Sequence, residues 1–350
     1  MAATSEPRQR LALAVSMGDP AGIGLEVTLK AWRARLDQSI PPFVLYADPS
    51  VVAERALALG LDVPVATLAS AREGIEAFTD ALPVVPLPPL AAAAHPGVPD
   101  AANAPAVIAA IERAVEAIVA GEASGLVTNP IAKSVLAAAG FPHPGHTDFL
   151  GELAARHFPG SPSQAVMMLA APELRVVPLT VHIPLARVPG EITRQAIEAT
   201  VRITHQSLVR DFRLPSPRIA VTGLNPHAGE DGTLGREEIE VIAPAISALR
   251  SAGMDVSGPH PADTLFHAGA RATYDAAVCM YHDQALIPFK TIAFDTGVNV
   301  TLGLPFVRTS PDHGTAFDIA ARGCASAQSF IEAVKLGAEI AAARARGAPS

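Results

Sequence analysis

The chain is poor in cysteine, and it has no long hydrophobic run. Its two cysteines, Cys279 and Cys324, stand far apart among 350 residues and form no Cys-x-x-Cys pair. Composition therefore excludes a disulfide framework and an all-cysteine structural metal site, and a reducing compartment such as the cytoplasm is expected. No apolar run approaches the roughly 20 residues that span a bilayer, and from the polar N-terminus we expect no export. We expect no membrane partner.

Charge is also scarce: only 17% of the residues are charged, and the net charge is −8. This acidic balance argues against nucleic acid as a partner, because DNA and RNA would be repelled. A phosphorylated ligand would have to be held by a few local cations. Apolar residues are abundant at 49%, many of them alanine, and the chain is long enough for two domains or one large α/β domain.

Expected strands and helices alternate along the chain. Strands are expected at 11–16, 43–47, 125–128, 165–170, 174–180, 219–223 and 276–280. Helices are expected at 24–36, 50–59, 106–120, 191–209, 236–250 and 326–344. This alternation predicts an α/β fold with a mostly parallel sheet and helices on both faces. The Pro/Ala-rich segment 82–105 is expected to be an irregular surface connection.

Three histidines, His182, His227 and His282, each follow an apolar run that is expected to be a strand. Strand ends of one parallel sheet converge, so these imidazoles are candidates for a catalytic divalent-metal site. A single histidine in such a place would more often have a structural role. Three histidines in matched contexts favour the metal-site interpretation. Asp263 is a candidate oxygen ligand or orienting partner, and a helix N-cap is an equally open interpretation.

A second group of residues suits an anion. Gly145-His146-Thr147-Asp148 predicts a helix that begins near Thr147, whose free N–H groups would favour a negative ligand, although an ordinary threonine cap explains the same pattern. Lys290 and Arg308 lie in strongly apolar surroundings, where an unpaired charge is costly. Together with Asn299 they are candidates for binding a phosphate or a carboxylate.

Two turns complete the candidates. Met17–Glu26 links a strand to a helix and contains several glycines, but it is neither a GxGxxG dinucleotide fingerprint nor a P-loop. Its glycines indicate a tight turn with close backbone approach. The segment Asp312–Asp318 is expected to open a helix and is a candidate nucleotide-binding loop.

Several of these motifs occur together in one known family. They are Gly-Asp-Pro-Ala-Gly-Ile-Gly at 18–24, Thr-Asn-Pro-Ile-Ala-Lys at 128–133, Gly-His-Thr at 145–147, Asn-Pro-His-Ala-Gly-Glu at 225–230, Tyr-His-Asp-Gln at 281–284 and Gly-Val-Asn-Val-Thr-Leu-Gly-Leu-Pro-Phe-Val-Arg-Thr-Ser at 297–310. Jointly the chain resembles the 4-hydroxythreonine-4-phosphate dehydrogenases from about Gly18 to Asp318. The run at 313–320 also resembles the adenosine-side loop of isocitrate and isopropylmalate dehydrogenases. Asp148 and Ala285 depart from the glutamate and glycine of many members.

The resemblance implies a three-layer α/β/α, two-domain fold like that of isocitrate and isopropylmalate dehydrogenases, with the active-site cleft between the domains. Residues 1–125 and 300–350 would form the nucleotide-side domain. Residues 126–299 would form the domain for metal, substrate and dimerisation. The family also implies a homodimer with the active site at the subunit interface.

The resemblance also implies roles for the candidate residues. The metal ligands would be His182, His227 and His282, holding one divalent zinc, cobalt or magnesium ion. The substrate-binding residues would be His146, Thr147, Lys290, Asn299 and Arg308. NAD or NADP would contact His313, Gly314, Thr315 and Asp318. The general base is not identified, and Asp263 and Lys290 are the candidates.

The reaction implied is NAD(P)-dependent oxidation and decarboxylation of 4-(phosphooxy)-L-threonine to 3-amino-2-oxopropyl phosphate, in pyridoxine 5'-phosphate biosynthesis. Three alternatives stay open. One is a dehydrogenase of phosphorylated threonate or erythronate, and another is a non-redox metal-dependent enzyme acting on a phosphorylated substrate. The third is a ligand-binding module in which the histidines are structural. The sequence does not distinguish NAD from NADP or name the metal.

Overall fold

The structure is a computed structural model that describes residues 11–143, 145–161 and 164–347. The chain divides into two compact units. Unit 1 comprises Met1–Ser161 and Pro305–Ala341, and unit 2 comprises Pro162–Leu304 and Ala342–Ser350. The domain boundary expected near residue 126 falls inside unit 1, because the strand that begins at Leu126 pairs with the first strand of that unit.

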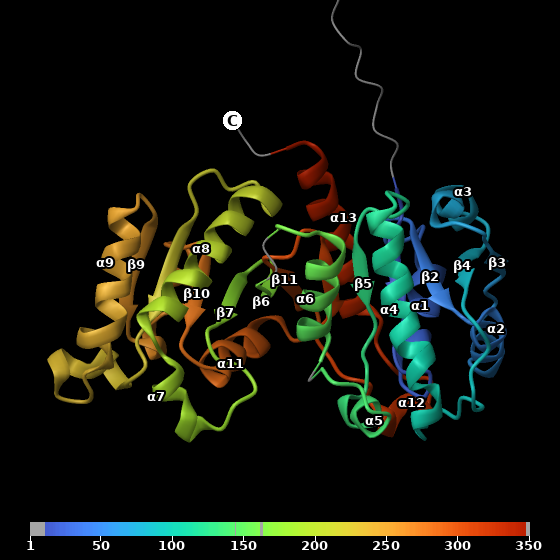
Figure 1. Ribbon diagram of the computed structural model, residues 1–350, viewed down its shortest axis with the longest axis horizontal. Coiled ribbons are helices and arrows are strands. Elements are labelled where there is room, and N and C mark those ends of the chain that lie inside the picture. The colour runs from blue at the N-terminus through green and yellow to red at the C-terminus, as the bar shows by residue number, and fades with distance from the viewer. Residues whose placement is uncertain (1–10, 144, 162–163, 348–350) are drawn as a thin grey trace, which may run out of the picture. The chain divides into compact units, whose positions relative to one another are not determined.

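Unit 1 is an α/β unit whose sheet strands are all parallel. Its elements are β1 Leu13–Ser16, α1 Gly24–Arg33, β2 Phe43–Ala47, α2 Pro49–Ala58, β3 Val65–Thr67, η1 Ala71–Glu73, α3 Gly74–Phe78, β4 Leu82–Pro86, η2 Ala101–Asn103, α4 Ala104–Val119, β5 Leu126–Thr128, α5 Lys133–Ala138, α6 His146–His157, β12 Arg308–Pro311, α12 Phe317–Ala320 and α13 Gln328–Ala345, whose last turn counts with unit 2. The strand order is β3-β4-β2-β1-β5-β12. Figure 1 shows helices on both sides of these strands.

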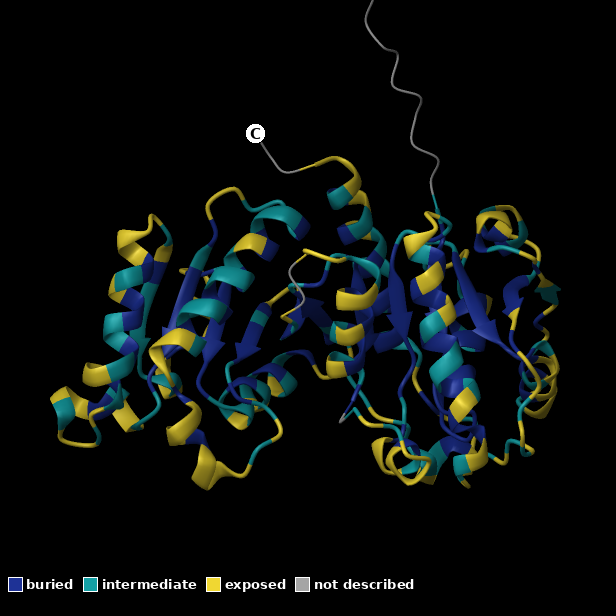
Figure 2. Ribbon diagram, viewed as in Figure 1, coloured by how far each residue is buried: buried dark blue, intermediate teal, exposed yellow. Residues whose placement is uncertain are grey.

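The core of unit 1 lies between its sheet and its helices. The central strands β1 and β2 are mostly apolar because both of their faces are covered, and Figure 2 shows central strands buried while the outer faces of the helices are exposed. Phe43 in β2 packs edge-on against Phe78 and Phe330, with ring centroids 4.9 and 5.9 Å apart. This packing fixes α3 and α13 on the sheet, and the carboxyl ends of the strands face the turns described below.

Unit 2 is a mixed α/β unit. Its elements are β6 Val166–Ala171, β7 Leu174–Pro178, η3 Leu185–Arg187, α7 Val188–Glu191, α8 Arg194–Asp211, β8 Arg218–Thr222, η4 Pro226–Gly232, the π-helical turn η5 Glu238–Ile242, α9 Ala243–Ser251, β9 Asp255–His260, η6 Ala262–Thr264, α10 Ala268–Arg271, β10 Ala276–Cys279, α11 His282–Ala293 and β11 Val298–Leu302. The strand order is β11-β6-β7-β10-β8-β9. β6 is antiparallel to both neighbours, and the pairs from β7 to β9 are parallel.

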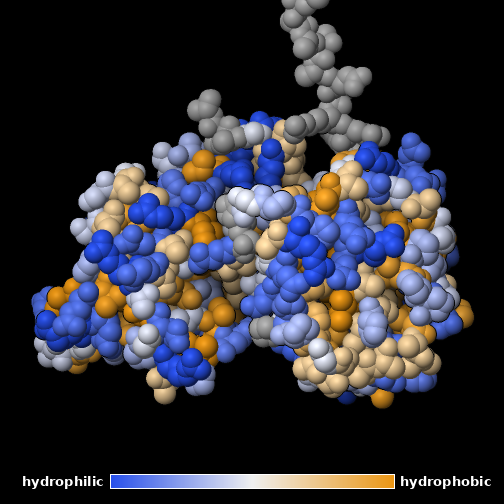
Figure 3. Space-filling view, in the orientation of Figure 1, coloured by the Kyte–Doolittle hydropathy of each residue, from blue (hydrophilic) through white to orange (hydrophobic). Residues whose placement is uncertain are grey.

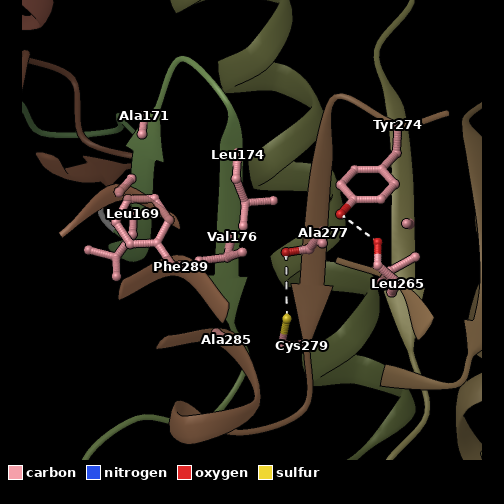
Figure 4. Packing of buried hydrophobic residues seen from close by; sticks show 12 residues of the cluster. Leu169, Ala171, Leu174, Val176, Leu265, Tyr274, Ala277, Cys279, Ala285 and Phe289 are labelled. Atoms are coloured by element: carbon pink, nitrogen blue, oxygen red, sulfur yellow. Dashed lines mark hydrogen bonds between the residues drawn. The ribbon is translucent and has the colours of Figure 1, made fainter. Parts of the chain in front are cut away.

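A hydrophobic cluster anchors α11 to the sheet of unit 2 (Figure 4). Phe289 projects from α11 toward Leu169 and Val176, and both Phe289 and Ala285 are fully buried. Burying a side chain such as Phe289 contributes about 1.5–3 kcal/mol relative to leaving it exposed. The cluster therefore fixes the first residue of α11, His282, relative to the ends of β7 and β10.

The expected α/β class is confirmed, and most expected strands and helices are present within a few residues. The expectation of an irregular connection at 82–105 is wrong at its start, because β4 occupies Leu82–Pro86 between β2 and β3. The strands β3, β9, β11 and β12 were also not predicted from the sequence. None of the described helices is long and apolar enough to cross a membrane.

Candidate active site

Three imidazoles lie at one edge of the sheet in unit 2. β7, β10 and β8 are consecutive parallel neighbours, and His182, His282 and His227 respectively follow their carboxyl ends. The carboxyl edge of parallel strands is where open α/β sheets bind ligands. The topology thus places at one sheet edge residues that are 45 to 100 positions apart in the chain.

Two of these imidazoles are close neighbours. The ring centroids of His182 and His282 lie 5.7 Å apart. A ring bound to zinc through a nitrogen at about 2.0–2.1 Å has its centre about 3 Å from the metal, so two such rings lie about 5 to 6 Å apart. The spacing of this pair fits two ligands of one divalent ion.

Carboxylates orient two of the three imidazoles. Nδ1 of His282 lies 2.7 Å from Oδ1 of Asp283, and Nδ1 of His227 lies 3.1 Å from Oε1 of Glu230. A ligand histidine commonly donates one ring N–H to such a partner, which fixes its tautomer. In both residues Nε2 is then the nitrogen that suits a metal.

The loop that carries His227 has an unusual backbone. His227, Ala228, Glu230 and Asp231 all have left-handed φ angles between 45° and 54°. Such residues cost free energy and persist only where their surroundings impose them. Here the carboxylate of Glu238, which is 3% exposed, accepts the N–H groups of Leu224 and Asn225 at 2.8 and 2.7 Å.

Gln284 connects the ends of β8 and β10. Its Oε1 accepts hydrogen bonds from Thr222 Oγ1 and Met280 N, both at 2.7 Å, and its Nε2 donates to Gly223 O at 2.8 Å. Gln284 follows His282 by two residues, so this network links the start of α11 to the start of the His227 loop. The family motifs at 225–230 and 281–284 therefore contain structural as well as ligand-type residues.

The metal site is not assembled as a complete cluster. Across residues 11–143, 145–161 and 164–347, no three His, Cys, Asp or Glu side chains are close enough together to hold a metal ion. His227 is 62% exposed. Asp263 is exposed in η6, which contacts η4, the segment that contains His227. The N-cap interpretation of Asp263 is wrong, because the N-cap of η6 is Pro261.

Unit 1 holds a separate cluster of basic groups. Arg308, at the start of β12, is 4% exposed and donates from Nη2 and Nε to Thr128 Oγ1 at 2.7 and 3.2 Å. Burial lowers the pKa of Arg308 to about 10, so the guanidinium stays charged at neutral pH. Nε2 of His146 is buried without a hydrogen-bond partner among the described residues.

Arg308 and Lys133 both act on His146. The pKa of His146 lies well below its ordinary value because the ring is buried, and because Arg308 and then Lys133 oppose its protonation. Lys133 lies against the residue before His146, since a Cβ atom on Gly145 would be 3.2 Å from its Cε. Two of these three basic groups, Arg308 and the ring of His146, are buried, whereas Lys133 is exposed, and together they favour an anionic ligand.

The other predicted substrate residues are divided between the two units. Thr147 is in the first turn of α6, which begins at His146; the alternative of a threonine cap is wrong, because the N-cap is Gly145 and no side chain caps the helix. Lys290 in α11 and Asn299 in β11 are half-buried residues of unit 2. His146, Thr147 and Arg308 belong to unit 1.

The candidate nucleotide loop follows β12 in unit 1. His313, Gly314 and Thr315 lie between β12 and α12, and Asp318 is in the first turn of α12. The expected helix opening is thus present. The turn of residues 17–26 lies beside this loop, because Ile23 N donates to Thr315 O at 3.0 Å.

The glycines of that turn make the close approach that the sequence predicted. Gly18 has a φ of +75°, and a Cβ atom there would be 2.7 Å from Asn129 Cβ and 2.8 Å from Pro130 O. Asp19, whose carboxylate accepts the N–H of Ala21 at 3.0 Å, is buried, and that burial raises its pKa.

Two solved structures define the class of protein. The chain is similar to the 4-hydroxythreonine-4-phosphate dehydrogenase of Klebsiella pneumoniae, with a TM-score of 0.84 and 34% identity covering 96% of this chain and 99% of that one. It is also similar to a terephthalate 1,2-cis-dihydrodiol dehydrogenase of Burkholderia xenovorans, with a TM-score of 0.62 and 28% identity covering 95% and 98%. The fold is therefore that of a class of α/β dehydrogenases.

The family follows from the sequence matches. A family model described as pyridoxal phosphate biosynthetic protein PdxA matches residues 38–337. A relative from Methylorubrum populi, named 4-hydroxythreonine-4-phosphate dehydrogenase, is 55% identical over 330 residues, which are 94% of each chain. The chain belongs to the PdxA family, an oxidoreductase family of vitamin B6 biosynthesis. The resemblance stated from the motifs is confirmed.

Sequence reasoning missed three residues that shape the site. Lys133 ends the motif at 128–133, Glu238 lies outside every motif, and Gln284 ends the motif at 281–284. Lys133 was detectable as a further lysine in an apolar context. The positioning role of Glu238 depends on contacts across 13 or 14 residues, which no local pattern reveals.

Proposed function

We propose that this chain binds one divalent metal ion and NAD or NADP, and oxidises and decarboxylates 4-(phosphooxy)-L-threonine to 3-amino-2-oxopropyl phosphate. The reaction would serve pyridoxine 5'-phosphate biosynthesis in the cytoplasm. The observation that carries the proposal is that His182, His227 and His282 each follow the carboxyl end of one of three adjacent parallel strands, in a chain of the PdxA family.

The donor set supports a metal ion of the zinc or cobalt type. Imidazole nitrogens suit zinc and cobalt better than magnesium, which prefers oxygen ligands. Asp283 and Glu230 would hold the rings of His282 and His227 with Nε2 toward the ion. When bound, the ion would lower the pKa of the substrate hydroxyl and the nicotinamide would accept the hydride.

The basic cluster of unit 1 would bind the anionic part of the substrate. Arg308 is charged and buried, and His146 Nε2 is available as a hydrogen-bonding group. Thr147 adds a hydroxyl, and the N–H groups of the first turn of α6 favour negative charge. Lys290 and Asn299 would contact the same substrate, and these contacts would hold the reacting carbon in place.

The remaining chemistry concerns protons and carbon dioxide. Oxidation of the C3 hydroxyl gives a β-keto acid, which loses CO₂ to yield the amino ketone. Asp263 and Lys290 are the candidates for the general base. Asp263 is exposed in η6 next to the His227 loop, and Lys290 lies two helical turns after His282 on α11.

The two departures from the family pattern leave the donor atoms unchanged. Asp148 is exposed in the first turn of α6, and Ala285 is fully buried in the cluster beneath α11. Neither residue supplies a group to the three imidazoles or to the basic cluster. Phosphorylated threonate and erythronate remain rival substrates, and they enter the turnover experiment as comparison arms.

We also propose a homodimer. Two large apolar side chains are exposed on α11 and at its C-cap, Ile287 at 65% and Phe294 at 70%. Leu185, three residues after His182, is 69% exposed. On the one face drawn in Figure 3, hydrophobic residues lie among hydrophilic ones. Exposed apolar residues on the helix that begins at His282 fit an interface close to the metal ligands.

Metal binding tests the role of the imidazoles. Wild-type protein should bind one Co²⁺ or Zn²⁺ per chain in equilibrium dialysis. His182→Ala, His227→Ala and His282→Ala should each weaken that binding at least about tenfold, as loss of a ligand does. His205→Ala, a half-buried histidine of α8, is the matched control and should bind like the wild type. Full metal retention in all three variants would contradict the proposal.

A further inference from the structure

Glu26 is a fully buried carboxylate that the proposed site does not use. It lies in α1, at the end of the glycine-containing turn of residues 17–26, and is 0% exposed. Lys30 Nζ lies 2.8 Å from Oε1 and Arg55 Nη2 lies 3.1 Å from Oε2. A buried charge is tolerated only when it is paired, so this carboxylate and its two cations form one unit.

The same three side chains hold the segment that follows the candidate nucleotide loop. Glu26 Oε1 accepts the N–H of Ala325 at 2.9 Å. Lys30 Nζ donates to Gly323 O at 2.9 Å and to Ala325 O at 2.7 Å, and Arg55 donates to Ala320 O. All of these bonds reach backbone atoms of residues 320–325, so they set the path of the chain.

The turn holds the other end of the loop. Ile23 N donates to Thr315 O, and a Cβ atom on Gly22 would lie only 3.0 Å from that same oxygen. Ala21 O accepts the N–H of Gly97 at 2.8 Å, and a Cβ on Gly97 would be 2.8 Å from Phe317 O. The backbone of residues 315–317 is therefore packed directly against the backbone of the turn at 17–26 and of Gly97.

The loop between these two anchors has a strained residue. Ala316, the N-cap of α12, has φ 45° and ψ 54°, in the left-handed region that costs a non-glycine residue about 1–2 kcal/mol. Such a conformation persists where the surroundings over-determine it. The bonds from residues 17–26, Lys30 and Arg55 supply that constraint on both sides of Ala316.

We propose that Glu26, with Lys30 and Arg55, is a positioning group that sets the backbone of residues 313–318 for binding NAD or NADP. The inference rests on the proposed nucleotide role of that loop. It also explains part of the motif at 18–24, because Gly22 admits the backbone of the loop and the helix that follows carries the carboxylate that anchors the far end. Glu26 acts through the loop and does not touch the cofactor.

The test compares two buried carboxylates of the same kind. Asp211 in unit 2 is 4% exposed and pairs with Arg210 and Arg344, which matches the two cations around Glu26. Glu26→Ala should raise the KM for the nicotinamide cofactor at least about tenfold while the KM for the phosphorylated hydroxy acid changes less than about twofold. Asp211→Ala should lose stability but keep the cofactor KM.

Two further variants keep the test decisive. Glu26→Gln retains an acceptor for Ala325 N and should recover part of the cofactor KM. Lys30→Met removes the hydrogen bonds to Gly323 and Ala325 at a partly exposed position. It tests the same positioning role if Glu26→Ala does not fold. Faster hydrogen exchange in residues 313–325 should accompany the raised KM in each affected variant.

The outcomes separate this inference from the proposed function. A wild-type enzyme that neither binds nor reduces NAD or NADP overturns both. An active wild type whose folded Glu26→Ala and Lys30→Met variants keep the wild-type cofactor KM overturns the positioning role alone.

Discussion

The imidazole of His146 lies beside two cations, and this placement has a pH consequence. Its pKa is below the ordinary value because of burial, Arg308 and Lys133, so the folded protein binds fewer protons here than the unfolded chain does. Stability from this group is therefore present above the unfolded-state pKa of about 6.5 and is lost as the pH falls below it. A bound phosphate would reverse the local electrostatics.

We therefore expect phosphate to raise the pKa of His146. An NMR titration of the imidazole signals with and without inorganic phosphate or 4-(phosphooxy)-L-threonine measures this directly. His205 is the control, because burial alone lowers its pKa and no cation contributes. A pKa of His146 that does not move at saturating ligand would show that the basic cluster does not bind the phosphate.

Individual residues also show where sequence reasoning reached its limit. The three histidines were found because each follows an apolar run, a local pattern. The pairing of His182 with His282, and the hold of Glu238 on the His227 loop, depend on contacts between strands and turns that are distant in the chain. The candidate chemistry could be predicted from the residue types, whereas the contacts that position these residues could be seen only in the folded structure.

Among the elements, strands with uninterrupted apolar runs were predictable and strands with polar or turn residues were not. β2 was predicted with its observed bounds, because all five of its residues are apolar and buried. β4 contains Pro83 and Pro86, residues that usually mark an edge or a break, although it pairs on both sides. β12 includes Arg308, Thr309 and Ser310, which local hydropathy assigns to a loop.

The turn that follows β1 offers a test of close packing. Gly18→Ala must place a methyl group 2.7 Å from Asn129 Cβ in addition to adopting a left-handed φ of +75°. Gly121→Ala is the matched control, with a φ of +65° and nothing within 4 Å of the added atom.

Gly121→Ala should lower the free energy of unfolding by about 1–2 kcal/mol, because alanine must adopt the left-handed backbone conformation. Gly18→Ala should cost about 1–3 kcal/mol more, because the methyl group also overpacks the turn. Urea unfolding of both variants measures the difference. Equal losses of unfolding free energy in the two variants would contradict this prediction. They would mean that the contact between the motifs at 18–24 and 128–133 relaxes to accommodate the methyl group.

The molecule as a whole is predicted to act as a dimer. Ile287→Ser with Phe294→Ser removes the two large apolar groups that are exposed on α11 and at its C-cap. Sedimentation velocity should then show a shift from dimer to monomer, while Leu57→Ser, which alters a residue 82% exposed on α2, should leave the assembly unchanged. A wild-type protein that sediments as a monomer would refute the homodimer, and an intact dimer in the double variant would place the interface elsewhere.

At this scale the family assignment and the sheet topology converge on one reaction. The PdxA family supplies the oxidoreductase class, and adjacent strands of unit 2 are followed by the three imidazoles that we propose as metal ligands. The domain assignment of nucleotide to unit 1 and metal to unit 2 is part of the proposal. It predicts that Glu26 variants affect the cofactor, and that histidine variants affect the metal.

The most direct measurement follows NADH and CO₂ together when metal-loaded protein meets NAD⁺ or NADP⁺ and 4-(phosphooxy)-L-threonine, with 4-phosphothreonate and 4-phosphoerythronate as rival substrates. The account predicts one NADH or NADPH and one CO₂ per threonine ester consumed, and loss of both products in His182→Ala. Turnover of a rival alone would contradict the proposed substrate while keeping a dehydrogenase. Metal-dependent release of phosphate without reduced cofactor would contradict the proposed reaction itself.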